Sequence, residues 1–118
     1  MNYFAIGAIS ACIVILLGAF GAHGLKDILD AYGKSIFEKA VLYQMFHTIG
    51  ILFLGVINKT MPEIQLELVG WAFIIGTIIF CGSLYILAIT GIKSLGMITP
   101  IGGLLFILGW IILFVKVL

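Results

Sequence analysis

The side chains best suited to chemistry gather in one short stretch, AVLYQMFHTIG at 40–50. Tyr43, Gln44, His47 and Thr48 lie three or four positions apart, so a helix would bring them together as one polar patch. A histidine is the natural proton carrier near neutral pH, and neighbouring hydroxyl and amide groups can bind a small solute. The alternative is a structural network of hydrogen bonds between helices.

The network interpretation needs polar partners on a neighbouring helix. Thr77, Ser83 and Tyr85, all in one later stretch, are the candidates. Groups of this kind inside a membrane are costly and should face the protein interior or water. Both interpretations of the polar patch therefore place it inside the protein.

Metal and cofactor sites find little support. His47 should lie roughly 13 Å deeper in the membrane than His23, so one metal or haem could not easily bind both. No Glu-x-x-His pair accompanies them, and no pair of cysteines lies near either histidine. We therefore expect no metal and no cofactor.

Catalytic residues are not predicted either. Cys12 and Cys81 have no adjacent base, and all five carboxylates lie outside the apolar stretches. His23 and Asp27 are a conceivable pair at the membrane surface for an enzyme acting on lipid, but an ordinary surface pair is the commoner outcome. The sequence thus favours a protein that is not an enzyme.

The composition identifies the solvent around these groups. Of 118 residues, 9% are charged and 64% hydrophobic, and the mean hydropathy is +1.34. Soluble domains carry roughly a quarter charged residues, and so small a core could not hide this apolar excess. Six lysines, no arginine and a net charge of +1 provide no basic face for nucleic acid. The sequence predicts a membrane protein without a nucleic-acid partner.

Four uncharged runs predict the membrane-spanning segments, and they cover 1–25, 40–58, 68–92 and 94–115. Each meets the length of about 20 residues that a helix needs to cross ~30 Å of hydrocarbon. The expected transmembrane helices lie near 3–22, 38–57, 68–90 and 98–117. Their connections are short, so we expect an all-α protein with one up-down bundle that forms a single domain over 1–118.

Only the first connection, HGLKDILDAYGKSIFEK at 23–39, is long enough to have structure of its own. Its apolar residues recur at helical spacing, and Asp30 precedes Lys34 in the order that favours a helical ion pair. This pattern predicts a short amphipathic helix in the membrane interface, which Gly33 ends before the second span. A solvated loop is the alternative.

Fifteen glycines indicate close packing of helices, since small residues let backbones approach each other in lipid. A glycine-lined passage for a small solute is the other interpretation. The string GAFGAHG at 18–24 has glycine spacing similar to a dinucleotide-binding turn, but no strand precedes it. Gly21 and Gly24 are instead expected to end the first helix in the left-handed conformation.

Pro100 indicates where the last helix begins. Proline is tolerated at the first helical position, and Thr99 before it can cap the freed backbone donors. Residues 94–98 would then be extended or irregular. A longer helix kinked at Pro100 is the alternative.

Four strings together resemble one known family: GAFGAHGL at 18–25, LYQMFHTIGIL at 42–52, CGSLYILAITG at 81–91 and TPIGGLLFILGW at 99–110. It is a family of small four-span membrane proteins classed as a domain of unknown function, found widely in bacteria and with a eukaryotic transmembrane relative. The matched motif positions are Gly18, Gly21, His23, Tyr43, Gln44, His47, Ser83, Tyr85, Thr99 and Pro100.

This resemblance implies a protein of the bacterial inner or plasma membrane without an established activity. Members often end in a basic tail that indicates a cytoplasmic C-terminus, and here only Lys116 lies near that end. The positive charges on the two sides number four against three and do not decide the orientation. We expect both termini in the cytoplasm.

We therefore expect a non-enzymatic structural or interaction bundle surrounded by membrane lipids, as a single copy or as a homo-oligomer. The alternative function is a small transporter or channel in which Tyr43, Gln44 and His47 bind a proton or solute. The sequence indicates no particular substrate or small-molecule ligand.

Overall fold

The computed structural model describes all residues, 1–118. Its elements are α1 (Tyr3–His23), α2 (Ala31–Thr60), α3 (Glu67–Thr90), the short 3₁₀ helix η1 (Lys93–Met97) and α4 (Thr99–Val117). Four helical segments are long and apolar enough to cross a membrane. The prediction of an all-α protein with four transmembrane helices is confirmed.

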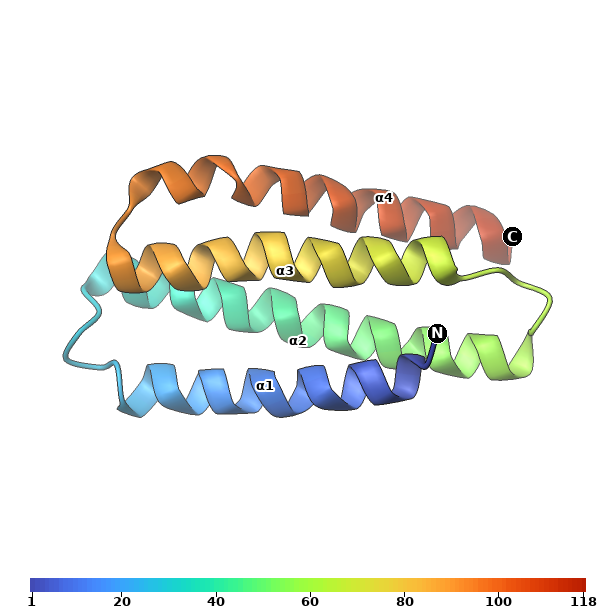
Figure 1. The fold of residues 1–118 in the computed structure, drawn as a ribbon, viewed down its shortest axis with the longest axis horizontal. Coiled ribbons are helices and arrows are strands. Elements are labelled where there is room, and N and C mark those ends of the chain that lie inside the picture. The colour runs from blue at the N-terminus through green and yellow to red at the C-terminus, as the bar shows by residue number, and fades with distance from the viewer.

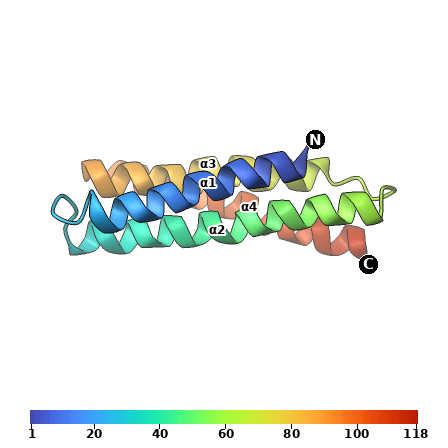
Figure 2. The same ribbon diagram turned by 90° about the horizontal axis from the view of Figure 1, so that it is seen from below.

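The helices run alternately in opposite directions and pack in chain order, α1 on α2, α2 on α3 and α3 on α4 (Figure 1). α1 and α4 lie at opposite edges of this view, and both termini lie toward the same end of the bundle. Seen from below, α1 runs at a slant in front of α3, and α2 lies alongside (Figure 2). The bundle is therefore elongated and flattened, 49 × 26 × 18 Å, with α2 and α3 as its central helices.

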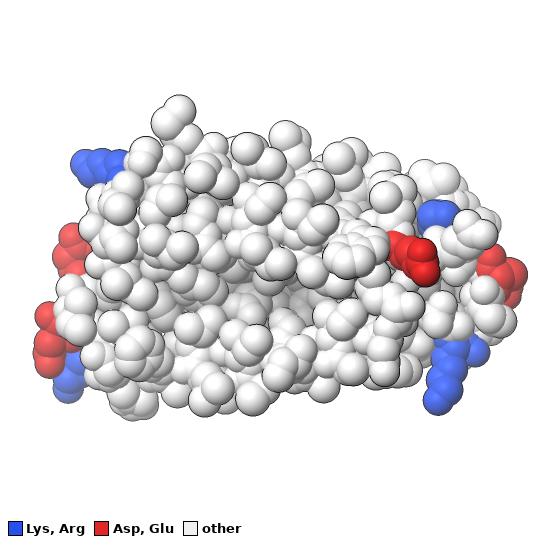
Figure 3. Space-filling model, viewed as in Figure 1, with Lys and Arg blue, Asp and Glu red and all other residues white.

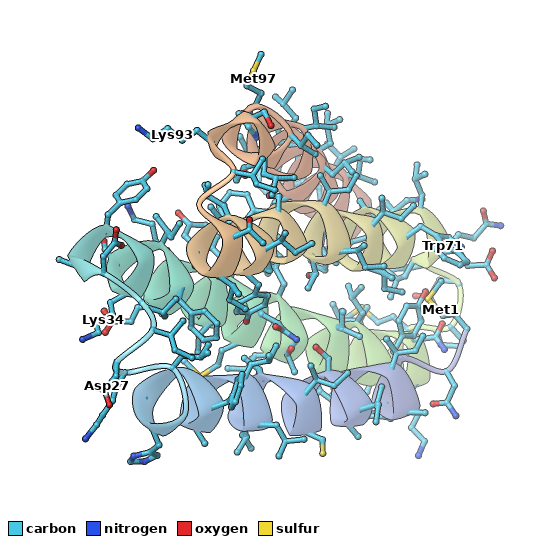
Figure 4. All side chains as sticks on the ribbon, turned by 60° about the vertical axis from the view of Figure 1, so that its left-hand side comes forward. Met1, Asp27, Lys34, Trp71, Lys93 and Met97 are labelled. Atoms are coloured by element: carbon cyan, nitrogen blue, oxygen red, sulfur yellow. The ribbon has the colours of Figure 1, made fainter.

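Charged side chains gather at the two ends of the molecule and leave an apolar belt between them (Figure 3). Asp27, Lys34 and Lys93 lie at one end, whereas Met1 and Trp71 lie toward the other (Figure 4). Large apolar side chains cover the outside of the belt, where lipid takes the place of water. The charges thus lie at both ends of the spans, as the sequence predicted.

The expected interfacial helix in the first connection is absent. Residues 24–28 form turns and Leu29 a bend. α2 begins directly after Asp30, whose carboxylate accepts a hydrogen bond of 2.6 Å from the N–H of Gly33. Asp30 is therefore an N-cap and not the partner of a helical ion pair. Gly33 does not end a helix, because it is buried in the first turn of α2, close to the carbonyl of Ala88.

The end of α1 also differs from the prediction. Gly21 lies inside the helix, and Gly24 has a right-handed conformation with φ −71° and ψ −31°. The chain leaves α1 through a bond of 3.0 Å from the Leu25 N–H to the Phe20 carbonyl, which turns Leu25 into the protein. Only Gly91, at the end of α3, has a positive φ, of 71°.

Close backbone approach joins α3 to α4. A Cβ atom built on Gly102 would lie 2.5 Å from the backbone nitrogen of Phe80, a distance that real Cβ atoms do not adopt. Only glycine permits this crossing, which favours the packing interpretation of the glycines in the fourth span. α4 begins at Thr99 with Pro100 in its first turn, as expected. Residues 94–97 are not extended or irregular, because they belong to the 3₁₀ helix η1.

Candidate functional site

The polar side chains of α2 point toward different helices instead of forming one patch. Thr48 reaches α1, where its hydroxyl shares a hydrogen bond of 2.6 Å with the hydroxyl of Ser10. Gln44 reaches α3, and its Oε1 accepts a hydrogen bond of 2.7 Å from the hydroxyl of Tyr85. Both α2 side chains are buried. α2 is thus connected to a different neighbouring helix at each of these two residues.

His47 reaches α4 and has a partner at each ring nitrogen. It is 2% exposed, its Nε2 lies 3.0 Å from Nε1 of Trp110, and its Nδ1 lies 2.9 Å from the carbonyl oxygen of Tyr43. An indole N–H can only donate, so Nε2 of the imidazole must accept. The imidazole proton therefore resides on Nδ1 and is donated to the Tyr43 carbonyl.

Aromatic rings enclose this imidazole. The Phe106 ring stacks on it with centroids 3.5 Å apart and planes 10° apart, and the edge-on Phe73 ring lies 5.2 Å away. To accept another proton, Nε2 would have to release the Trp110 indole inside this shell. The geometry therefore favours a structural link between α2 and α4 over a proton carrier.

Tyr43 is the exception among the predicted patch residues. Its side chain is 40% exposed, and its ring packs against Phe80 of α3 at a centroid distance of 4.6 Å. Tyr43 takes part in the network only through its backbone carbonyl, which accepts the hydrogen bond from Nδ1 of His47. The side chains of Tyr43 and His47 thus belong to different surroundings despite their helical spacing.

A fourth polar link joins the two last helices. The hydroxyls of Ser83 and Thr99 lie 2.6 Å apart, and Ser83 donates to the carbonyl of Phe80 at 2.9 Å. The expectation that Thr99 caps α4 is wrong, since no side chain caps this helix and the Thr99 hydroxyl is turned toward α3. Pro100 is exposed in the first turn.

Thr77 is the predicted partner that the network does not use. Its Oγ1 is enclosed by protein and makes no hydrogen bond. Of the three hydroxyls proposed on the third span, Tyr85 alone bonds to a polar side chain of α2, while Ser83 bonds toward α4. The network is therefore a set of separate pairs, each joining two helices.

The remaining predicted residues lie outside these pairs. His23 is exposed as the last residue of α1, while Gly18 and Gly21 face Val41 and Phe37 of α2. The free cysteines differ in environment: Cys12 is exposed, and Cys81 is buried. Nowhere do three or more His, Cys, Asp or Glu side chains gather as metal ligands would.

Two residues of the network, Ser10 and Trp110, were not predicted. Ser10 is the only serine or threonine of the first uncharged run, and Trp110 is the only tryptophan of the last one. A hydroxyl or an indole N–H inside a membrane needs an acceptor within the protein. The presence of these lone donors in the first and last runs is the signal that points to Thr48 and His47 of the second span as their partners.

Comparison with known proteins gives a consistent result. The family described as "Protein of unknown function (DUF423)" matches residues 17–103. A protein named "UPF0382 membrane protein" in Staphylococcus saprophyticus is 49% identical over 111 residues, covering 94% of this chain and 92% of the relative. A relative of the same name in Staphylococcus epidermidis is 47% identical over 116 residues, covering 98% of this chain and 94% of the relative. No solved structure matches significantly.

Proposed function

Because this chain belongs to the DUF423 family of membrane proteins, whose activity is not established, we propose that it is a non-enzymatic structural or interaction bundle. In this proposal the intramembrane polar groups hold the helices together. The outer helix faces then contact lipid and other membrane proteins.

The arrangement around α2 carries the proposal. Thr48, Gln44 and His47 bond to α1, α3 and α4 respectively, so one helix is linked to all three others. Hydrogen bonds between membrane helices contribute on average about 0.6 kcal/mol each, so several are needed for a stable bundle. Transport has less support, because the proposed binding groups of Gln44 and His47 already have partners within the protein.

Proteoliposomes test this function directly. Wild-type protein and the variant His47→Leu are reconstituted at equal density, and dissipation of an imposed pH gradient is followed with an internal dye. The proposal expects both preparations to match protein-free liposomes in proton flux, while His47→Leu unfolds more readily in detergent. Proton flux that is present in the wild type and lost in His47→Leu would contradict it.

We also propose that the bundle forms a homo-oligomer through α1. This outer helix has the smallest buried share among the four spans, and it carries the exposed Cys12. Oxidative cross-linking in native membranes should give a dimer in the wild type and none in Cys12→Ser. Cys12→Ser retains the buried Cys81, so this variant is the matched control. A wild-type chain that stays monomeric under oxidation at Cys12 would rule out contact at this position.

For location we propose the cell membrane with both termini in the cytoplasm. The orientation is carried over from family members that often end in a basic tail, since this chain has only Lys116 near its C-terminus and its lysine distribution is nearly even. Single cysteines are placed at Asn2 or Lys93 in a chain without its native cysteines. Lys93 lies at one end of the bundle, and Met1, next to Asn2, lies toward the other (Figure 4). A membrane-impermeant maleimide applied to intact cells should label position 93 and not position 2, and the reverse pattern would invert the topology.

A further inference from the structure

A cavity opens where α1 leads into α2. It has a volume of about 420 Å³ and lies between the last turns of α1, the connection and the first turns of α2. Gly18, Phe37 and Val41 line its apolar part, and the lining also includes the exposed Lys26 and Lys34, which we call its rim. No hydrogen-bonding pair of the network described above lines it.

The cavity extends from the charged end of the bundle into the apolar belt. Lys34 and Val41 are separated by seven positions of α2, which at about 1.5 Å per residue places them roughly 10 Å apart along the helix. A phospholipid has the same arrangement, with a charged phosphate at the membrane surface and apolar chains below it. Lys34 lies at the end of the bundle, at the level expected for such a phosphate (Figure 4).

The charge of the rim selects among phospholipids. Lys26, Lys34 and Glu38 are the charged residues that line the cavity, so the rim carries a net positive charge. Basic residues close to the membrane surface attract acidic lipids. A zwitterionic lipid brings its own ammonium group and therefore gains less from these two lysines.

The apolar part has room for a chain because Gly18 has no side chain. A Cβ atom at this position would meet only Val41, at 3.7 Å, which is an ordinary contact. A methyl group at Gly18 would thus fit beside Val41, and both residues line the cavity. Gly21 differs, because a Cβ atom there would overlap the ring of Phe37.

We propose that this α1–α2 cavity binds one anionic glycerophospholipid. Its phosphate lies at Lys26 and Lys34, and one acyl chain lies against Gly18, Phe37 and Val41. Glu38 weakens the attraction and limits binding to lipids that carry net negative charge. The volume is typical of small-ligand pockets, so most of both acyl chains stays in the bilayer.

Native mass spectrometry of the purified full-length protein tests this inference. Phosphatidylglycerol and phosphatidylcholine with identical acyl chains are added in competition, and the ratio of the two bound species is measured. Each of Lys26→Gln and Lys34→Gln should lower the preference for phosphatidylglycerol about five-fold. Glu38→Gln should raise it, and the matched control Lys39→Gln, at an exposed lysine outside the cavity, should leave it unchanged.

Other outcomes overturn the proposal. Equal binding of the two lipids would show that the cavity does not select charge. The same conclusion would follow if Lys39→Gln and Lys34→Gln lowered the preference for phosphatidylglycerol equally. Soluble glycerol phosphate that binds as tightly as phosphatidylglycerol would show an anion site that does not need lipid. Gly18→Leu, which fills the apolar part, should reduce binding of both lipids. The lysine and glutamate substitutions are at exposed positions, so the test does not depend on whether Gly18→Leu folds.

Discussion

The indole N–H of Trp110 points at Nε2 of His47, with the two nitrogens 3.0 Å apart. This bond joins α2, one of the two central helices, to the outer helix α4. It also determines the tautomer of His47, because the Trp110 nitrogen can only donate. A residue that resembles a proton carrier in the sequence is therefore a hydrogen-bonded link between helices.

Removing the indole donor should weaken the bundle. Trp110→Phe retains an aromatic ring but leaves the buried His47 Nε2 without a partner, so the free energy of unfolding should fall by about 1–2 kcal/mol. Unfolding by SDS in mixed micelles, followed by circular dichroism so that loss of the Trp110 fluorophore does not alter the signal, measures this change. A double-mutant cycle with His47→Leu should give a coupling of about 0.6–1.7 kcal/mol. Strictly additive losses would show that the bond contributes nothing.

The tautomer of His47 can be observed directly. In protein labelled with ¹⁵N-histidine at neutral pH, Nδ1 of His47 should have the chemical shift of a protonated nitrogen and Nε2 that of an acceptor. The exposed His23 gives the second set of signals, and His23→Gln assigns the two. A His47 ring protonated at Nε2 alone would contradict the hydrogen bond from Trp110.

Glycine substitutions should separate close helix packing from simple helix propensity. Gly102→Ala places a methyl group 2.5 Å from the Phe80 nitrogen, so α3 and α4 must move apart, at a cost of about 1–3 kcal/mol in unfolding free energy. Gly82→Ala is the matched control, because nothing lies within 4 Å of a Cβ atom there. The same SDS titration should show Gly82→Ala as neutral or stabilising, since alanine favours the helix. If both variants lose the same unfolding free energy, close packing at Gly102 is not the cause of the loss.

The main features of the fold could be predicted because the bilayer imposes them. A helix must satisfy its backbone internally and be long enough to cross the hydrocarbon, so uncharged runs indicate the spans directly. The cost of polar groups in lipid likewise predicts that the polar patch of the second span lies inside the protein. Gln44, His47 and Thr48 are buried as predicted, whereas Tyr43 is 40% exposed. Burial thus follows from the cost of polar groups in lipid.

The partners of these side chains could not be predicted in the same way. Residues three or four apart share one side of a helix, but that side is broad enough to face several neighbours when the helix is central. Thr48 and His47 are adjacent in sequence and bond to α1 and α4, at opposite edges of the bundle. Which neighbour each contacts depends on how α2 is packed, and helical spacing alone does not contain this information.

The first connection was wrongly predicted because two local interactions compete for one carboxylate. Asp30 has the right spacing for an ion pair with Lys34, yet aspartate is also among the preferred N-cap residues. In the structure the cap is formed, so α2 begins at Ala31 and continues as one helix to Thr60. Burial of Gly33 against α3 offsets the low helix propensity of glycine.

The N-cap itself can be tested by amide hydrogen exchange. Asp30→Ala removes the acceptor of the Gly33 N–H, which should destabilise the first turn of α2 by about 1 kcal/mol and speed exchange there roughly five-fold. Asp27→Ala is the control, because it removes an equal charge from the same connection without removing the cap. Exchange at Gly33 and Lys34, the first hydrogen-bonded amides of α2, should increase in Asp30→Ala only, while the middle of α2 stays protected in both variants. If both variants exchange alike, the charge of the connection and not the cap stabilises the start of α2.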